Sequence, residues 1–279
     1  MNFKDCIDSY PFILMEGALG ERLKREFDLD ISGTVAMADL IYQQKGRMAL
    51  KTLWNEYMDI AHRYQLPFLA TTPTRRANKE RVYMAGYNES IITDNVDFLR
   101  TIKETANVNM YIGGLMGCKG DAYTSERALN QEEAIAFHSW QASLFKSVGV
   151  DFLYAGIMPV LSEAIGMAVA MSDTDIPYII SFTIQRNGKL IDGHTINDAI
   201  YYIDNHVSNK PVCYMTNCVH PDIVYEALSH KFNQTQMVKN RFWGIQANTS
   251  RLSYKELDGA KNLRTSSAVD LGKAILRLK

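Results

Sequence analysis

The chain has 279 residues, of which 47% are hydrophobic and 22% are charged, so it can bury one large core, and we expect a single domain over residues 1–279. Its formal net charge of -1 gives no overall attraction to nucleic acid or anionic membranes, so small molecules are the expected partners. No apolar run approaches the roughly 20 residues of a transmembrane helix, and residues 1–10 lack a signal-peptide pattern, which predicts a cytoplasmic protein.

Strand-like and helix-like segments alternate along the chain. Apolar runs that end in polar or glycine-rich residues predict strands at 12–15, 66–70, 108–112, 150–155, 178–183, 211–218 and 242–247. Apolar periodicity predicts helices at 46–64, 162–171, 221–231 and 267–278. Capping residues predict three more: one from Thr93 to about 103, one that begins at the pair Asn130 and Glu133 and runs to 148, and one from Thr195 or Asn197 to 207. This alternation favours a parallel sheet with helical crossovers over an antiparallel meander.

A doubly wound open sheet would alternate in the same way. Such a sheet usually gathers its ligand loops near one switch point, whereas here polar residues follow nearly every predicted strand. We therefore predict the α/β class and a (β/α)8 TIM barrel, with the eighth strand and helix missing from the given sequence.

Two predicted loops carry their own signals. Gly113, Gly114 and Gly117 are predicted to open a long loop that runs to Leu129, and their spacing matches no phosphate-binding or dinucleotide-binding motif. Asn187-Gly188 predicts a tight turn in a polar excursion over residues 185–193.

In barrels of this class the chemistry lies at the C-terminal ends of the strands. The residues predicted for that rim are Glu16, Thr72, Cys118, His194, Asn217, Cys218, His220 and Asn248. Two cysteines and two histidines suit tetrahedral zinc, yet Cys118 and His194 come from long loops, and a lone cysteine is more often a small buried apolar residue. No Ser-His-Asp order or nucleophile elbow is present, which argues against a hydrolase.

Several motifs, taken in order, resemble the homocysteine S-methyltransferase family of zinc-dependent thiol-methylating barrels. They are Leu14-Met15-Glu16-Gly17-Ala18-Leu19-Gly20, Thr71-Thr72-Pro73-Thr74, Gly113-Gly114-Leu115-Met116-Gly117, Ile180-Ser181-Phe182-Thr183, Asn217-Cys218-Val219-His220-Pro221 and Gln246-Ala247-Asn248-Thr249-Ser250. The resemblance extends from about Phe12 to the end of the sequence.

The resemblance implies an S-methyltransferase that moves a methyl group from a small donor to the thiol of homocysteine or a related thiol. Cys218 looks like the first of three zinc thiolates, and zinc would lower the pKa of the substrate thiol. By the same resemblance Glu16 accepts a hydrogen bond from the substrate amino group, and Asn217 and Asn248 orient its polar end. Thr72 and His220 complete the expected substrate contacts.

Two departures from the family pattern qualify these expectations. The Gly-Gly-Cys-Cys motif that carries the other two zinc cysteines is absent from the sequence, so zinc is expected only if further cysteines follow Lys279, and we favour a polypeptide that continues. Gly156 stands about where many members have a substrate-binding glutamate, and Glu16 replaces the usual aspartate. Both changes make homocysteine less certain as the acceptor than thiol methylation itself.

Two other functions stay open from the sequence. One is an enzyme of the same fold that has lost zinc and acts on another small metabolite through Glu16, His194 and His220. The other is a non-catalytic barrel that binds a small molecule or another subunit. The methyl donor and the oligomeric state are also open.

Overall fold

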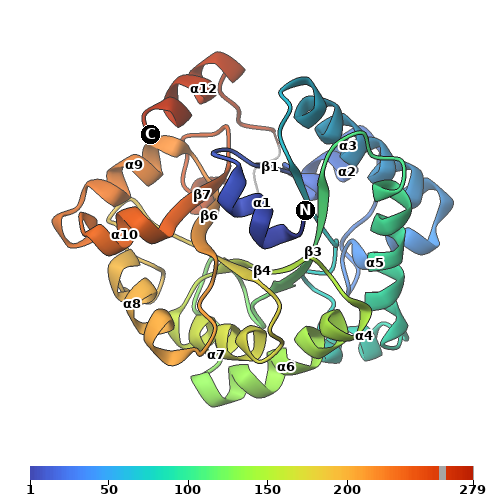
Figure 1. Cartoon of the computed structure of the whole chain (residues 1–279), viewed down its shortest axis with the longest axis horizontal. Helices are drawn as coiled ribbons and strands as arrows, with labels where there is room; N and C mark the ends of the chain where they lie inside the picture. Colours follow the sequence, from blue (N-terminus) through green and yellow to red (C-terminus); the bar gives the residue numbers. More distant parts are fainter. Residues whose placement is uncertain (258–261, 279) are drawn as a thin grey trace. The chain divides into compact units, whose positions relative to one another are not determined.

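The computed structural model describes residues 1–257 and 262–278 (Figure 1). In these ranges seven strands form one sheet in which each strand hydrogen-bonds to its neighbours in sequence order. The strands are β1 (Leu14–Met15), β2 (Phe68–Thr71), β3 (Met110–Gly117), β4 (Phe152–Met158), β5 (Tyr178–Phe182), β6 (Cys213–Val219) and β7 (Phe242–Ala247). The pairs β1–β2, β2–β3, β5–β6 and β6–β7 are parallel.

Helices lie before, between and after the strands. They are α1 (Phe3–Ser9), α2 (Leu19–Glu26), η1 (Ala38–Tyr42), α3 (Gln44–Arg63), α4 (Lys79–Met84), α5 (Ser90–Lys103), α6 (Gln131–Val148), α7 (Leu161–Ser172), α8 (Ile196–His206), α9 (Pro221–Ser229), η2 (Lys231–Asn233), α10 (Gln236–Arg241), α11 (Tyr254–Leu257) and α12 (Ala268–Leu276). Parallel strands in sequence order that alternate with helices confirm the predicted TIM-barrel fold class. Among the described helices none combines the length and apolar character needed to cross a membrane.

The chain forms two compact units, each with its own internal packing. The first contains Met1–Met116, Phe137–Tyr154 and Thr174–Pro177. The second contains Gly117–Ala136, Ala155–Asp173 and Tyr178–Lys279. The assignment of residues 1–279 to a single domain stays a prediction.

In the first unit, β3 is longer than predicted because its glycines belong to the strand. A Cβ atom on Gly113 would come within 2.4 Å of the Phe152 ring, and one on Gly114 within 2.6 Å of the Phe145 ring. These two positions therefore have no room for a side chain. The prediction that Gly113, Gly114 and Gly117 open a loop was wrong, because close packing of aromatic rings, rather than chain flexibility, explains the glycines.

In the second unit, β5 and β6 are buried on both faces, as strands of parallel sheets are. Every residue of β5 is buried, and in β6 the single half-buried residue is Cys218. Phe182 of β5 stacks on Tyr214 of β6 with ring centroids 5.4 Å apart. The same burial continues β4 to Met158, three residues beyond its predicted end.

The helix starts predicted at Asn130, Thr195 and Ser267 are confirmed. Asn130 and Glu133 exchange hydrogen bonds of 3.0 and 3.1 Å ahead of α6, and Thr195 and Ser267 cap α8 and α12. The predicted cap at Thr93 was wrong, since α5 begins at Ser90. Ile91 and Ile92 are fully buried, and this burial extends the helix by one turn.

The last helix forms where the sequence predicts it, but most of its apolar side chains are uncovered. Val269 is 65% exposed and Leu276 is 61% exposed, and Ala274 is the residue that is buried. The helix lies beside α9 (Figure 1), and Arg277 forms an ion pair with Asp222 of α9. A small residue and one ion pair therefore set its position within the second unit.

The glycine packing in β3 can be tested by adding one methyl group. We expect Gly113→Ala to lower the free energy of unfolding by about 1–3 kcal/mol, because the new Cβ atom overlaps the Phe152 ring. Gly33→Ala is the matched control, since a Cβ atom there meets nothing within 4 Å. Chemical denaturation of both variants measures the difference, and equal stability would contradict this account of β3.

Candidate functional site

The first unit places a buried carboxyl group directly after β1. Glu16 is 4% exposed, and its backbone N–H donates to the carbonyl of Leu69 in the neighbouring strand at 3.2 Å. The backbone N–H of Thr71 donates to both carboxyl oxygens of Glu16, at 3.0 and 2.9 Å, and the Thr71 hydroxyl donates to Oε1. The end of β2 thus holds the carboxyl group in one orientation.

Burial controls the ionisation of this group. Removal from water raises the pKa of Glu16 from 4.5 to about 8, although the hydrogen bonds from Thr71 act in the opposite direction. At neutral pH the side chain is therefore mostly an uncharged acid that becomes a carboxylate when a cation approaches.

Thr72 lies at the same strand end and is fully buried. Its hydroxyl oxygen accepts a hydrogen bond from Leu115 N at 3.1 Å and lies 2.7 Å from the Thr74 hydroxyl. Because Thr74 donates its own proton to the carbonyl of Leu115, the Thr72 hydroxyl must donate to Thr74. One lone pair of the Thr72 oxygen remains for a ligand.

In the second unit, Cys218 lies near the end of β6 in an unusual backbone conformation. Its φ is +63°, in the left-handed region that residues with a side chain rarely adopt. Asn217 pairs with Gln246 and Val219 pairs with Ala247, so Cys218 is an extra residue that forms a bulge. The bulge removes Cys218 from the regular ladder of β6, and its side chain is half-buried.

Two asparagines at these strand ends have their carbonyl oxygens already engaged. Ser181 of β5 donates to Oδ1 of Asn217 at 2.6 Å. Oδ1 of Asn248, which follows β7, accepts from Ser250 N at 3.0 Å. Each amide nitrogen therefore remains as the donor that the side chain can offer to a ligand.

His220 is fully buried and begins α9. Its Nδ1 accepts a hydrogen bond from Asp222 N at 3.1 Å, which assigns the proton of the neutral ring to Nε2. Burial lowers the pKa of His220 and keeps the ring uncharged. Among the described residues, Nε2 has no hydrogen-bond partner. Capping of α9 thus accounts for one ring nitrogen and leaves the other as a donor.

The sulfur and imidazole groups predicted for the rim do not assemble into a metal site. Cys118 is buried with its sulfur 3.6 Å from the carbonyl oxygen of Gly120, and Nδ1 of the partly exposed His194 lies 3.1 Å from an Asp192 oxygen. Across residues 1–257 and 262–278 no three His, Cys, Asp or Glu side chains are placed to hold a metal ion. The possible set of Cys118, His194, Cys218 and His220 is therefore wrong, and the described residues do not fit a zinc centre.

Two further residues support these strand ends and were missed from the sequence. The carboxyl group of Glu163 in α7 is fully buried and accepts from Lys119 N at 2.7 Å and Leu129 N at 3.4 Å, which anchors the segment before α6. Ser181 orients Asn217 through its hydroxyl group. A charged residue in the mostly apolar 161–171 stretch was the available signal for Glu163.

The buried carboxyl group predicts a specific pH dependence of stability. Between pH 4.5 and 8 the folded protein keeps a proton on Glu16 that the unfolded chain has released. The free energy of unfolding of the natural protein therefore falls as the pH rises from 4.5 to 8. We expect Glu16→Gln to gain stability relative to the natural protein over this range, by at most about 1.4 kcal/mol per pH unit.

Urea denaturation at pH 5, 6, 7 and 8 measures this difference, with the exposed Glu104→Gln as the matched control. A stability difference between the Glu16→Gln variant and the natural protein that does not change with pH would show that Glu16 titrates normally.

Comparison with known proteins places this geometry in one family. The sequence profile described as "Homocysteine S-methyltransferase" matches residues 13–269. The curated protein "Homocysteine S-methyltransferase YbgG" of Bacillus subtilis (strain 168) is 21% identical over 217 residues, which cover 72% of this chain and 67% of that protein.

Solved structures support the fold. The metallated form of the homocysteine methyltransferase MmuM from Escherichia coli superposes with a TM-score of 0.67 at 18% identity and covers 81% of each chain. Its apo form gives a TM-score of 0.57 at 18% identity, with 80% of this chain and 78% of that chain covered. The match to the family profile spans most of the sequence, and the chain therefore belongs to the homocysteine S-methyltransferase family and is a methyltransferase.

Proposed function

We propose that this protein transfers a methyl group from a small donor to the thiol of homocysteine or a closely related amino thiol. The observation that carries the proposal is the family match over residues 13–269, which includes Asn217-Cys218 at the bulged end of β6. The names of the relatives YbgG and MmuM support homocysteine as the acceptor. Methionine would then be the product, which suggests a role in methionine formation.

The proposed reaction is a displacement at carbon. The acceptor thiol first loses its proton to solvent, and the resulting thiolate attacks the methyl carbon of a sulfonium, quaternary ammonium or N-methyl donor. The new carbon–sulfur bond takes the electron pair of the thiolate. The bond between the methyl group and the donor heteroatom breaks, and that heteroatom keeps the bonding pair. A sulfonium or quaternary ammonium donor leaves as a neutral thioether or amine, and an uncharged N-methyl donor does so only after its nitrogen has taken a proton from solvent.

Glu16 is the proposed partner of the acceptor's ammonium group. In the free protein it is a neutral acid, and an approaching cation favours its ionised form. Binding of the ammonium group would release the Glu16 proton and create an ion pair out of water. This role would compensate for Gly156, which provides no carboxylate at the end of β4.

Asn217 and Asn248 are proposed to bind the acceptor's carboxylate. Both offer amide N–H groups, because their carbonyl oxygens are already engaged by Ser181 and Ser250. Nε2–H of His220 is a further proposed donor to the substrate. Thr72 would contact it through the remaining lone pair of its hydroxyl oxygen, since its proton is committed to Thr74.

Zinc enters the proposal conditionally. A structural or catalytic zinc site needs three or four protein ligands, and Cys218 is the one candidate thiolate at the end of β6. We propose Cys218 as a zinc ligand in a protein that supplies at least two further thiolates. Bound zinc would lower the pKa of the acceptor thiol.

We propose that the protein acts in the cytoplasm on small molecules. The four cysteines without a disulfide spacing support this location. The formal net charge of -1 supports the absence of nucleic acid and membrane partners.

The proposal predicts that purified protein methylates homocysteine with at least one donor from a panel of sulfonium, quaternary ammonium and N-methyl folate compounds. We expect Cys218→Ser to lower kcat/KM by about a hundredfold or more and to remove any stoichiometric zinc. Methionine formation measured by mass spectrometry and zinc measured by elemental analysis check both expectations.

Cys118→Ser is the control, because this buried cysteine contacts the Gly120 carbonyl and has no proposed role in the reaction. Unchanged methylation in the Cys218→Ser variant would favour a zinc-free enzyme of the same fold. A folded protein that forms no methionine with any donor would favour a binding protein.

A further inference from the structure

A small pocket lies within the second unit, beside the strand that carries Cys218. Its volume is about 290 Å³, at the small end of the roughly 300–1,000 Å³ that ligand sites occupy. Val219 of β6 and Ile223 of α9 line it together with Ile184, which follows β5. These residues make an apolar wall for a ligand of one or two rings.

One side of the pocket is an aromatic ring that is already fixed in place. Tyr254 lines the pocket, and its ring stacks on Tyr123 with centroids 5.1 Å apart and planes 21° apart. The stacking partner limits rotation of the Tyr254 ring, so its surface is preorganised for a planar ligand.

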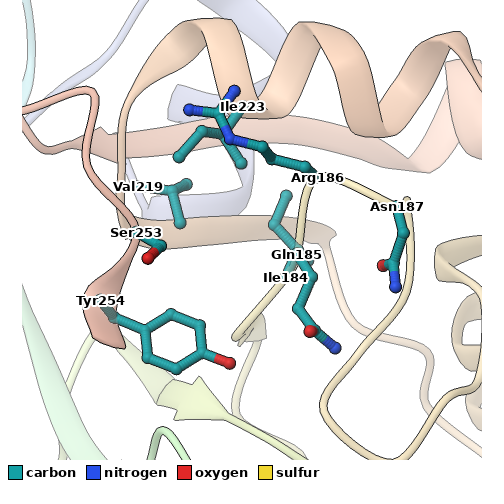
Figure 2. A pocket seen from close by; sticks show the side chains of 8 residues that line it. All are labelled: Ile184, Gln185, Arg186, Asn187, Val219, Ile223, Ser253 and Tyr254. Carbon is teal, nitrogen blue, oxygen red and sulfur yellow. The ribbon is translucent and has the colours of Figure 1, made fainter. Parts of the chain in front are cut away.

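Two carboxamides lie on the side of the pocket toward which the Tyr254 hydroxyl group is directed, as Figure 2 shows. Nε2 of Gln185 donates to the Leu190 carbonyl at 2.9 Å, which leaves the Gln185 carbonyl oxygen as an acceptor. Oδ1 of Asn187 accepts from Lys189 N at 3.1 Å, which leaves its NH2 group as a donor. The pocket therefore presents an acceptor and a donor beyond the hydroxyl edge of the Tyr254 ring, where they can meet the polar edge of a ligand stacked on that ring.

The positive charge of Arg186, which lines the pocket, is paired with the carboxylate of Glu226. Nη1 of Arg186 lies 2.8 Å from both carboxylate oxygens of Glu226, and Nη2 donates to the Arg251 carbonyl at 2.8 Å. A ligand that carries a negative charge would have to compete with Glu226 for this guanidinium group. The arrangement thus favours an uncharged ligand.

We propose that this pocket binds an uncharged planar nitrogen heterocycle of the purine class. Such a base stacks on Tyr254, donates an exocyclic N–H to the Gln185 carbonyl and accepts from the Asn187 NH2 group through a ring nitrogen. Val219 and Ile223 contact its apolar edge. Binding of this base is separate from the proposed methyl transfer. It can therefore be measured in the absence of any methyl donor or thiol.

Adenosine is the probe, titrated calorimetrically into the full protein at neutral pH, with ribose as the ligand that lacks the base. We expect adenosine to bind with a Kd below about 1 mM and ribose to give no heat of binding. We also expect AMP to bind no more tightly than adenosine. Absence of adenosine binding up to several millimolar overturns the proposal, and tighter binding of AMP overturns the uncharged ligand class.

Variants locate the binding site. Tyr254→Leu should weaken adenosine binding about tenfold or more because the stacking surface is lost, whereas Tyr254→Phe should retain it. Tyr201→Leu on the exposed face of α8 is the matched tyrosine control and should leave the Kd unchanged. Equal affinity in the natural protein and the Tyr254→Leu variant overturns the assignment to this pocket.

Thermal unfolding verifies that each variant is folded. If Tyr254→Leu does not fold, Gln185→Met removes the acceptor with little change in side-chain length and should weaken adenosine binding at least threefold. Unchanged affinity in the Gln185→Met variant would equally overturn the proposed geometry.

Discussion

Parallel strands that are buried on both faces leave their polar side chains few places other than the strand ends, and this constraint organises the structure. β5 is buried along its whole length and β6 along all but Cys218. Glu16, Thr72, Asn217 and Asn248 accordingly lie at or just beyond the ends of their strands. The chemistry of the chain is therefore concentrated where the regular hydrogen-bond ladder stops.

At those ends the polar groups are held by backbone and hydroxyl groups of neighbouring segments. Thr71 holds both oxygens of Glu16, and Ser181 holds the carbonyl of Asn217. The bulge that sets the φ of Cys218 at +63° is retained by the regular pairs on either side of it. These contacts orient the side chains before any ligand binds, which lowers the entropy cost of binding.

The sequence predicted those features that depend on local chemistry. The bounds of β7, the capping pair Asn130 and Glu133, and the strand-to-helix transition at His220-Pro221 all match the structure. The glycines of β3 were misread because their meaning depends on Phe152 and Phe145, which lie far away in sequence. The short helices α1, α2 and α4 were also missed, because six to eight residues carry too little periodicity to distinguish a helix from a loop.

The sequence identified residues of the candidate site, but not their protonation or their backbone conformation. Motif order identified Glu16 and Cys218, whereas the raised pKa of Glu16 follows from complete burial, and the left-handed conformation of Cys218 follows from its register against β7. Likewise, the exposed apolar side chains of α12 could not be anticipated, since periodicity shows that a helix has an apolar side and not whether anything covers it.

The central claim is that Glu16 is a neutral acid in the free protein and ionises when the ammonium group of an amino-acid substrate binds to it. The most direct measurement is calorimetric titration with methionine, which has this ammonium group and no thiol, at pH 7 in buffers of different ionisation enthalpy. The account predicts the release of about one proton per methionine bound, and none in Glu16→Gln, because the pKa of Glu16 falls from about 8 when the cation binds. Methionine binding without proton release, or release that persists in Glu16→Gln, would contradict it.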